Sequence, residues 1–167
     1  MKKFEVKPGT NGMGTDFPLF RYAEVLLMKA ECLLRLGQSG AGDLVTAVRE
    51  RAFKSNPAKA AVTDEQLKEN SCYNYYFYAG DYAFSNPANR KYGAHDKDKL
   101  EFGRLYDEYG WEFAWEMGVR TRMIRFGTYT TRNWCSHEAL GDYTALFPIP
   151  FAAITANPNL EQNPDYE

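Results

Sequence analysis

Apolar side chains recur at helical spacing from Leu19 onward, and this stripe predicts the first helix of the chain. Asp16 is the expected N-cap, and Gly37 is expected to end the helix with a positive φ. Arg21 and Glu31 fall between the apolar positions and are expected on the opposite, polar side of the helix. The apolar positions of the stripe are Leu19, Tyr22, Ala23, Leu26, Leu27, Ala30, Leu33 and Leu34.

A second helix is predicted over Asp43–Phe53, after a short glycine-containing turn at residues 40–42. Two helices joined in this way form an antiparallel hairpin of the tetratricopeptide type. Further along the chain, Thr63 and Gln66 have the spacing of a capping box, which predicts a short third helix toward Asn70. The first part of the chain is therefore expected to be helical.

A longer helical pattern follows over Lys99–Met117, with Asp98 as the expected N-cap. Gly118 is expected to break this helix, and a shorter helix is predicted over Val119–Phe126, closed by Gly127. Together with the hairpin, these segments predict a mainly α-helical fold with long ordered loops. Two glycines inside the long helix are expected to weaken it by about 1 kcal/mol each relative to alanine, namely Gly103 and Gly110.

The last tract, residues 146–167, is rich in proline and asparagine but also carries several apolar side chains. Proline fixes its own φ and favours extended backbone in the preceding residue, so we expect an extended run with one helical turn at Phe151–Thr155. Turns are expected at Asn157-Pro158 and Asn163-Pro164. We predict a C-terminal clasp that docks on the helical hairpin Leu19–Phe53 and on the long helix. The apolar side chains of the tract are Leu146, Phe147, Ile149, Phe151, Ile154 and Leu160.

Residues 72–96 form an aromatic loop insertion that has no helical period and is too long for a routine connection. The chain has 12 Tyr, 11 Phe and 3 Trp, and many of them fall in this segment. Aromatic faces can cover the apolar face of a sugar ring while amide groups bind its hydroxyls. The alternative is that these rings pack a satellite core under a long loop. The candidate ligand contacts are Tyr75, Tyr76, Tyr78, Tyr82, Asn86, Asn89 and, in a second irregular stretch, Trp134.

Length and charge limit the remaining possibilities. The 167 residues fit a single domain, predicted over 1–167 with an irregular lead-in at 1–16, and the net charge of -2 gives no electrostatic case for nucleic-acid binding. Cys135 and His137 lack further ligands at suitable spacing, so no metal site and no cofactor is predicted. No apolar run reaches about 18 residues, and the start of the chain lacks the apolar core of a signal peptide. A cytosolic protein and a piece of a longer chain both remain open.

Glu112 and Glu116 stand four residues apart, and glycosidases use a pair of carboxylates. The alternative is an ion-pair network with Arg120 and Arg122 that locks the helix bend at Gly118. The sequence has no nucleophile-elbow, metalloprotease, dinucleotide-binding or P-loop motif. We therefore predict no catalytic residues and no enzymatic activity, with a glycoside hydrolase as the less favoured alternative.

Three motifs occur in one order along the chain. The first is FPLFRYAEVLLMKAE at residues 17–31, and the second is WEFAWE at 111–116 followed by IRFG at 124–127. The third, LFPIP with NPNLEQNPDY, lies within residues 146–166. Together they resemble the SusD/RagB family, and the third is similar to that family's C-terminal ending almost residue for residue. One departure is Arg122, which stands where the family usually has an acidic residue.

The resemblance implies the C-terminal part of a longer lipoprotein on the extracellular face of the outer membrane, built on a tetratricopeptide-like scaffold. Such a protein binds an oligosaccharide ligand and delivers it to a SusC-like TonB-dependent outer-membrane transporter without hydrolysing it. Attachment to the membrane would be only through a lipid anchor outside this sequence. The motifs themselves are expected to be scaffold, so ligand contacts are expected in Tyr73–Tyr92 and around Trp134. In the alternative, this part is a structural or interaction module, and the preceding part of the longer protein binds the ligand.

Overall fold

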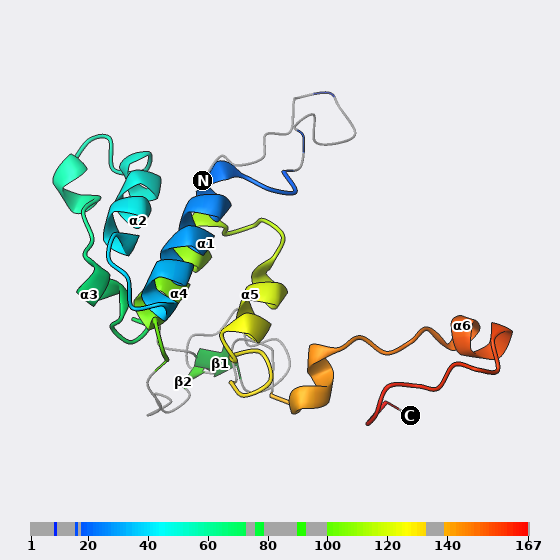
Figure 1. Ribbon diagram of the computed structural model, residues 1–167. Helices are drawn as coiled ribbons and strands as arrows, with labels where there is room; N and C mark the ends of the chain where they lie inside the picture. The colour runs from blue at the N-terminus through cyan, green and yellow to red at the C-terminus, as the bar shows by residue number, and fades with distance from the viewer. Residues whose placement is uncertain are drawn as a thin grey trace. The chain divides into compact units, whose positions relative to one another are not determined.

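The structure is a computed structural model that describes residues 9, 16, 18–72, 76–78, 90–92, 100–132 and 139–166. The chain forms two compact units, residues 1–72 with 99–119 and residues 73–98 with 120–167. The prediction of a mainly helical fold is confirmed (Figure 1), and the single domain over 1–167 stays a prediction. The elements are α1 (Tyr22–Arg35), α2 (Ala41–Glu50), the 3-10 helix η1 (Pro57–Lys59), α3 (Asp64–Leu67), β1 (Tyr76–Tyr78), β2 (Arg90–Tyr92), α4 (Gly103–Glu112), α5 (Val119–Arg125), the 3-10 helix η4 (Asp142–Ala145) and α6 (Phe151–Ala156).

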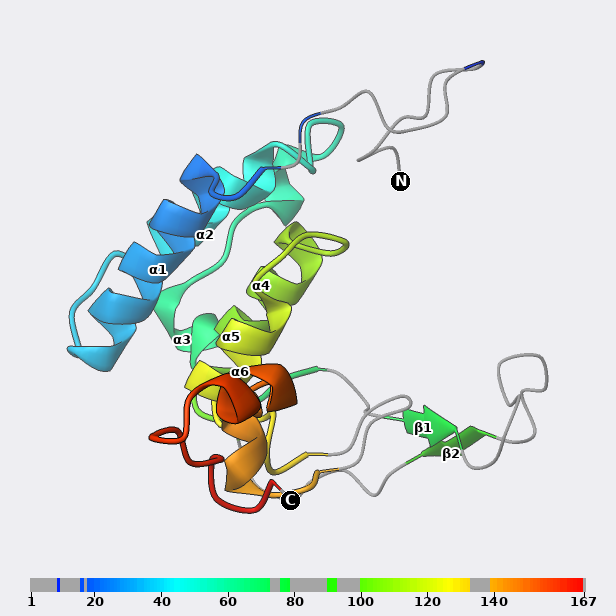
Figure 2. The same cartoon turned by 90° about the vertical axis from the view of Figure 1, so that its right-hand side faces the viewer.

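In the first unit, α1 and α2 form the predicted antiparallel hairpin and lie side by side (Figure 2). Helix α1 also packs against α4, while α3 contacts both α2 and α4. The carboxylate of Asp64 accepts hydrogen bonds from the backbone N–H groups of Gly40 and Gly42, at 2.9 and 2.5 Å. This carboxylate therefore caps the start of α2, where the first N–H groups of a helix have no partner inside it. The buried apolar side chains of the hairpin are Leu27, Ala30, Leu34, Ala41, Val45 and Val48.

Helix α1 differs from the prediction at its start and on its polar side. It begins at Tyr22 rather than after Asp16, because Arg21 is extended (φ -130°, ψ 152°) and its side chain reaches Glu112 and Glu116. Glu31, expected on the polar side, is only 4% exposed. Two bonds satisfy its carboxylate, one from Arg35 Nε at 3.0 Å and one from the Tyr109 hydroxyl at 3.1 Å. Another part of α1 is exposed and carries Val25, Met28 and, just after the helix, Leu36. Tyr22, which was expected in the apolar stripe, is also exposed.

The helix ends that follow are set by local chemistry. The capping box at Thr63 is confirmed, since its hydroxyl accepts from Gln66 N–H while the Gln66 side chain accepts from Thr63 N–H. Helix α4 is shorter than the predicted Lys99–Met117, because Phe102 and Trp115 adopt left-handed φ values of 53° and 65° and interrupt the helical backbone. Helix α5 lies between Gly118 and Gly127, both with positive φ, and confirms the predicted short helix.

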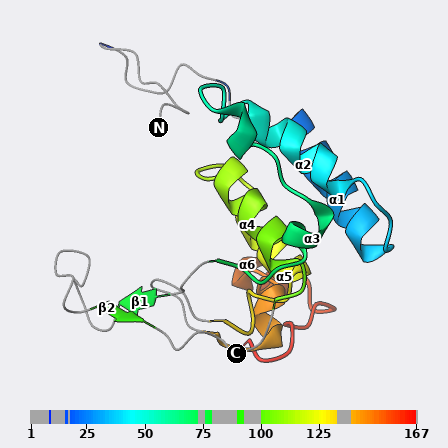
Figure 3. The same cartoon turned by 90° about the vertical axis from the view of Figure 1, so that its left-hand side faces the viewer.

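In the second unit, β1 pairs with β2 as an antiparallel two-stranded sheet within the aromatic segment (Figure 3). The register pairs Tyr76 with Tyr92, Phe77 with Lys91 and Tyr78 with Arg90. Sequence periodicity did not predict these strands, because three residues are too few to show an alternating pattern. Among the described residues, no helix has the length and the apolar run needed to cross a membrane.

The C-terminal tract folds back on itself within the second unit, as Figure 1 shows for the segments on either side of α6. The Gln162 side chain bonds both backbone groups of Ile149, at 2.8 Å for its N–H and 2.9 Å for its carbonyl. Asn163 and Tyr166 donate to the carbonyls of Phe147 and Leu146. The expected helical turn and both Asn-Pro turns are confirmed. Docking of this clasp on the helical hairpin stays a prediction.

Hydrogen bonding rather than apolar burial holds this fold-back, because Leu146, Phe147 and Phe151 are exposed. Arg120 of α5 adds two more bonds, from Nη2 to the carbonyls of Thr144 and Ala145 at 2.8 and 3.0 Å. Its guanidinium also lies 4.0 Å from the centre of the Phe147 ring. The start of the tract is thereby tied to α5.

Replacing Gln162 with alanine should lower the free energy of unfolding by about 1–2 kcal/mol, because two backbone groups of Ile149 lose their partner. Equilibrium urea unfolding measures this loss. Glu161→Ala, at the neighbouring exposed position, is the matched control and should change stability by less than about 0.5 kcal/mol. Equal effects of the two substitutions would contradict the role given to Gln162.

Candidate functional site

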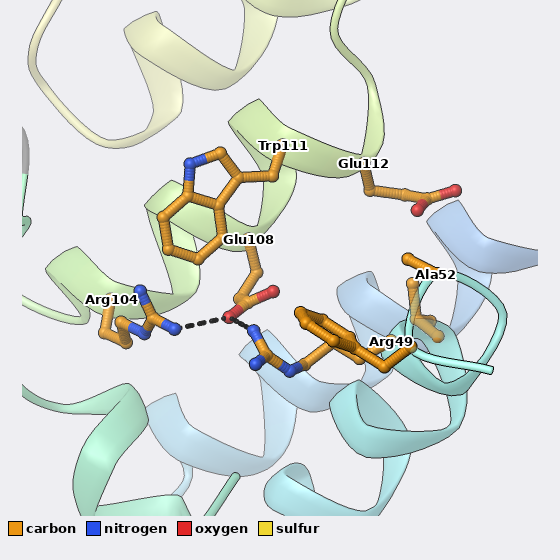
Figure 4. Close-up of a pocket in the computed structure, with 8 residues that line it drawn as sticks. Arg49, Ala52, Arg104, Glu108, Trp111 and Glu112 are labelled. Carbon is orange, nitrogen blue, oxygen red and sulfur yellow. Dashed lines mark hydrogen bonds and ion pairs between the residues drawn. The ribbon is translucent and has the colours of Figure 1, made fainter. Parts of the chain in front are cut away.

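A pocket of about 380 Å³ opens between α2 and α4 in the first unit (Figure 4). Helix α4 contributes one face of side chains, which stand at i, i+4, i+7 and i+8 and therefore point to the same side of the helix. The end of α2 and the turn after it contribute the opposite wall. The lining residues are Val48, Arg49, Ala52, Phe53, Arg104, Glu108, Trp111 and Glu112.

Glu108 lies in this pocket between two arginines, Arg49 and Arg104, and forms a salt bridge with each of them. Its Oε1 accepts a hydrogen bond from Arg49 Nη1 at 2.5 Å and forms a salt bridge with Arg104, whose Nη2 lies 3.1 Å away. The residue is only 5% exposed, and its Oε2 has no partner among the described residues. In Figure 4 this second oxygen points away from both arginines. The pocket therefore contains one hydrogen-bond acceptor that is not used by the protein itself.

Burial raises the pKa of the Glu108 carboxyl above its ordinary value. The charges of Arg49 and Arg104 oppose this rise, and the nearby Asp107 adds to it. Arg49 is fixed further by bonds to the carbonyls of Ala60 and Lys59, at 2.8 and 2.7 Å. Arg49 is thus held in the protein by three hydrogen bonds, one to Glu108 and two to backbone carbonyls.

Two aromatic rings form the apolar part of the pocket. The Arg104 guanidinium lies 4.2 Å from the centre of the Trp111 ring, and that of Arg49 lies 4.9 Å from the centre of the Phe53 ring. Trp111 nevertheless remains 37% exposed. Such cation–π contacts hold the aromatic side chains in place while leaving part of the indole accessible.

Beside the pocket, Arg21 binds the two carboxylates that were candidates for catalysis. It donates from Nη1 to Glu112 at 2.7 Å, and from Nε and Nη2 to the two oxygens of Glu116 at 2.7 and 3.0 Å. Arg51 also bonds Glu112, at 2.5 Å. Arginine partners for this pair were predicted, but as Arg120 and Arg122 rather than Arg21 and Arg51, and Arg120 bonds the backbone of the C-terminal tract instead.

Burial acts to lower the pKa of Arg21, but the hydrogen bonds and charges of Glu116 and Glu112 outweigh it, so the pKa is raised above its ordinary value. The side chains of Glu112 and Glu116 are 10% and 7% exposed. Glu116 also lies beyond the end of α4, so the two are not neighbours on one helical face. This arrangement is a structural ion-pair network between the start of α1 and the end of α4.

Comparison with known proteins shows which family the chain belongs to. The family model described as the SusD family matches residues 1–166. The chain belongs to the SusD family. It is 26% identical over 161 residues to the starch-binding protein SusD of Bacteroides thetaiotaomicron. The aligned residues cover 92% of this chain and 22% of that protein. It is 29% identical over 151 residues to the SusD-like protein P25 of Formosa agariphila, with 85% of this chain and 22% of that protein covered.

A solved structure agrees with this assignment. The structure of B. fragilis NanU matches with a TM-score of 0.57 and 29% sequence identity, over 91% of this chain and 27% of that one. The chain thus spans about a fifth of the length of the curated SusD relatives it matches. The motifs at residues 17–31 and 111–116 contain Arg21, Glu112 and Glu116, so the ion-pair network joins two segments of the SusD resemblance.

The residues predicted to contact a ligand in this SusD-family chain lie mostly outside the described residues. Tyr76 and Tyr78 are on β1, where the structure describes the backbone pairing only. The two therefore share a short strand and stay predicted ligand contacts. The others, which stay predictions, are Tyr75, Tyr82, Asn86, Asn89 and Trp134.

Sequence reasoning missed the pocket between α2 and α4. One signal was readable, because Arg104, Glu108 and Trp111 stand at i, i+4 and i+7 of a predicted helix. Their partner Arg49 is 59 residues from Glu108 in sequence, and no local pattern connects the two. Among the described residues, no group of three or more His, Cys, Asp or Glu side chains is placed to hold a metal ion.

Proposed function

We propose that this chain is part of a cell-surface glycan-binding protein that delivers oligosaccharides to a SusC-like TonB-dependent outer-membrane transporter. The family match over residues 1–166 is the observation that carries the proposal. One matched relative is a starch-binding protein by name, which favours a carbohydrate as the ligand class. On this proposal the protein sits at the extracellular face of the outer membrane, and a lipid anchor outside this sequence holds it there.

The proposed protein binds its ligand without hydrolysing it. A retaining or inverting glycosidase needs two carboxylates that face a common sugar and can exchange protons with it. Glu112 and Glu116, the pair considered for that role, are both engaged by Arg21 and mostly buried. The structural use of both carboxylates supports a binding protein over a hydrolase.

The aromatic loops remain the proposed place for contacts with a longer oligosaccharide. Replacing Tyr75, Tyr76 and Trp134 together with alanine should weaken glycan binding by tenfold or more, because each ring can contribute about 1 kcal/mol of contact with a sugar face. Titration calorimetry measures the affinity, and the melting temperature should stay unchanged. Trp115→Ala is the matched control, since this tryptophan is 82% exposed. Unchanged affinity of the triple variant would remove these loops from the site.

A second candidate is a structural and interaction module of the same complex, with ligand binding in the part of the longer protein that this chain does not span. The exposed apolar face of α1 favours it, because exposed contiguous apolar surface marks protein–protein contacts. A well-folded sample that binds none of a panel of oligosaccharides would support this candidate over the first.

A further inference from the structure

We propose that the pocket between α2 and α4 is a binding site for one uncharged sugar ring, with Trp111 as the platform and Glu108 Oε2 as the hydroxyl acceptor. The proposal rests on the proposed glycan-binding function and assigns it a site outside the aromatic loops. It uses residues that the SusD resemblance had suggested to be scaffold.

The free oxygen of Glu108 is the first argument. A carboxylate oxygen that opens to a pocket takes a hydrogen-bond donor from water or from a ligand. Glu108 is 5% exposed as a residue, and its contacts with Arg49 and Arg104 both involve Oε1. Its Oε2 borders the pocket and is not a fully buried atom, so solvent reaches it. A ligand O–H group can replace that water as the donor.

The aromatic walls are the second argument. A sugar ring has an apolar face of C–H groups, which packs on an aromatic side chain while the hydroxyls at its edge form hydrogen bonds. Trp111 stands three residues after Glu108 on α4, so both side chains project to the same side of the helix. Phe53 lines the opposite wall. The Arg104 guanidinium lies over one face of the Trp111 ring, so the apolar contact comes from the exposed remainder of the indole and from Phe53, beside a polar acceptor.

The local charge selects an uncharged ligand. An anionic group would meet the carboxylate oxygen of Glu108, while a cationic group would meet Arg49 and Arg104, which flank that carboxylate. A neutral hydroxyl encounters neither repulsion. The volume of about 380 Å³ lies at the lower end of the range for small-molecule pockets, which suits one ring or two rather than a long chain.

The test follows the indole N–H resonance of Trp111 in the ¹⁵N-labelled full chain, assigned by its loss in Trp111→Phe. The probes are methyl α-D-glucopyranoside and methyl β-D-galactopyranoside, with D-glucosamine and D-glucuronate as charged counterparts. At least one neutral glycoside should move the resonance saturably. Both charged sugars should bind at least tenfold more weakly than that glycoside.

Three variants separate the site from general effects. Ala52→Leu, at an exposed pocket-lining position, should fill the pocket and abolish the shift without lowering the melting temperature. Glu108→Gln should weaken binding about tenfold, because an amide N–H₂ replaces an acceptor oxygen. Trp115→Phe, outside the pocket lining, should leave binding unchanged.

An unmoved Trp111 resonance, or an equal response in Ala52→Leu, would overturn the proposal. Calorimetric titration of the same sample with oligosaccharides distinguishes failure of this site from failure of the proposed glycan-binding function. If oligosaccharides bind while Trp111 does not respond, this site is wrong and the glycan-binding function stands. If neither glycosides nor oligosaccharides bind, both proposals fail.

Discussion

Replacing Gly103 with alanine is expected to destabilise the protein by about 3 kcal/mol, one of the two largest effects of a single substitution that the structure predicts. Gly103 opens α4 against the segment after α3, and a Cβ there would lie 2.7 Å from the carbonyl carbon of Asn70 and still nearer the backbone N of Ser71. That segment cannot retreat easily, because Asp107 holds Ser71 Oγ at 2.6 Å and Cys72 N at 2.7 Å. Urea unfolding measures the loss.

Gly110→Ala on the same helix is the matched control, and its effect should have the opposite sign. Gly110 is exposed, and a Cβ there would meet nothing within 4 Å. Alanine should then stabilise α4 by about 0.5–1 kcal/mol through its higher helix propensity. Two destabilising glycine substitutions of similar size would contradict the close contact assigned to Gly103.

Arg21→Met is expected to cost about 2–3 kcal/mol. It leaves Glu112 and Glu116 without the guanidinium that bonds both, in sites where their side chains are 10% and 7% exposed. Removing one partner of a fully buried ion pair costs about 3–5 kcal/mol, and the partial exposure of Arg21 reduces this figure. Because Arg21 lies just before α1 and Glu112 ends α4, the contact between these helices should loosen.

Arg51→Met provides the control, because Arg51 also bonds Glu112 but is 62% exposed. Surface ion pairs contribute about 0–1 kcal/mol, so this variant should unfold close to wild type. In the Arg21→Met background, Glu116→Gln should recover part of the loss, because it removes a mostly buried charge that has lost its bonds to Arg21. A loss in Arg51→Met as large as that in Arg21→Met would show that the network is not centred on Arg21.

The elements that sequence predicted are those with local chemical signals. Thr63 and Gln66 cap α3 with their own side chains, and Gly118 and Gly127 bound α5 through positive φ values. The prolines and asparagines of the C-terminal tract likewise set its turns without distant partners. Helices α1 and α2 were predicted from the helical spacing of their apolar residues, which is also a local signal because the buried face recurs at every turn.

The features that sequence missed depend on partners far along the chain. Glu31 is buried because the hydroxyl of Tyr109, 78 residues later, donates to it. Helix α4 ends early because Trp115 takes a left-handed φ that is uncommon for a side chain of its size. The pocket needs Arg49 from α2 beside Glu108 from α4, and neither helix predicts the other. Such pairings follow from tertiary packing.

The SusD-family motifs acquire a physical meaning from these contacts. The helix-opening motif contributes Arg21 and the WEFAWE motif contributes Glu112 and Glu116, so the two motifs are joined by ion pairs. The C-terminal motif closes on itself through Gln162, Asn163 and Tyr166. These residues stabilise the scaffold, and the proposed ligand contacts lie elsewhere, in the pocket between α2 and α4 and in the aromatic loops.

We propose that this SusD-family chain binds oligosaccharides and does not cleave them. Calorimetric titration of the full chain with a panel of plant and host oligosaccharides tests it most directly, with reducing ends assayed in the same mixtures. We expect saturable binding of at least one oligosaccharide and no new reducing ends. Reducing-sugar release that disappears in Glu116→Gln, or silence of a folded sample across the panel, would contradict it.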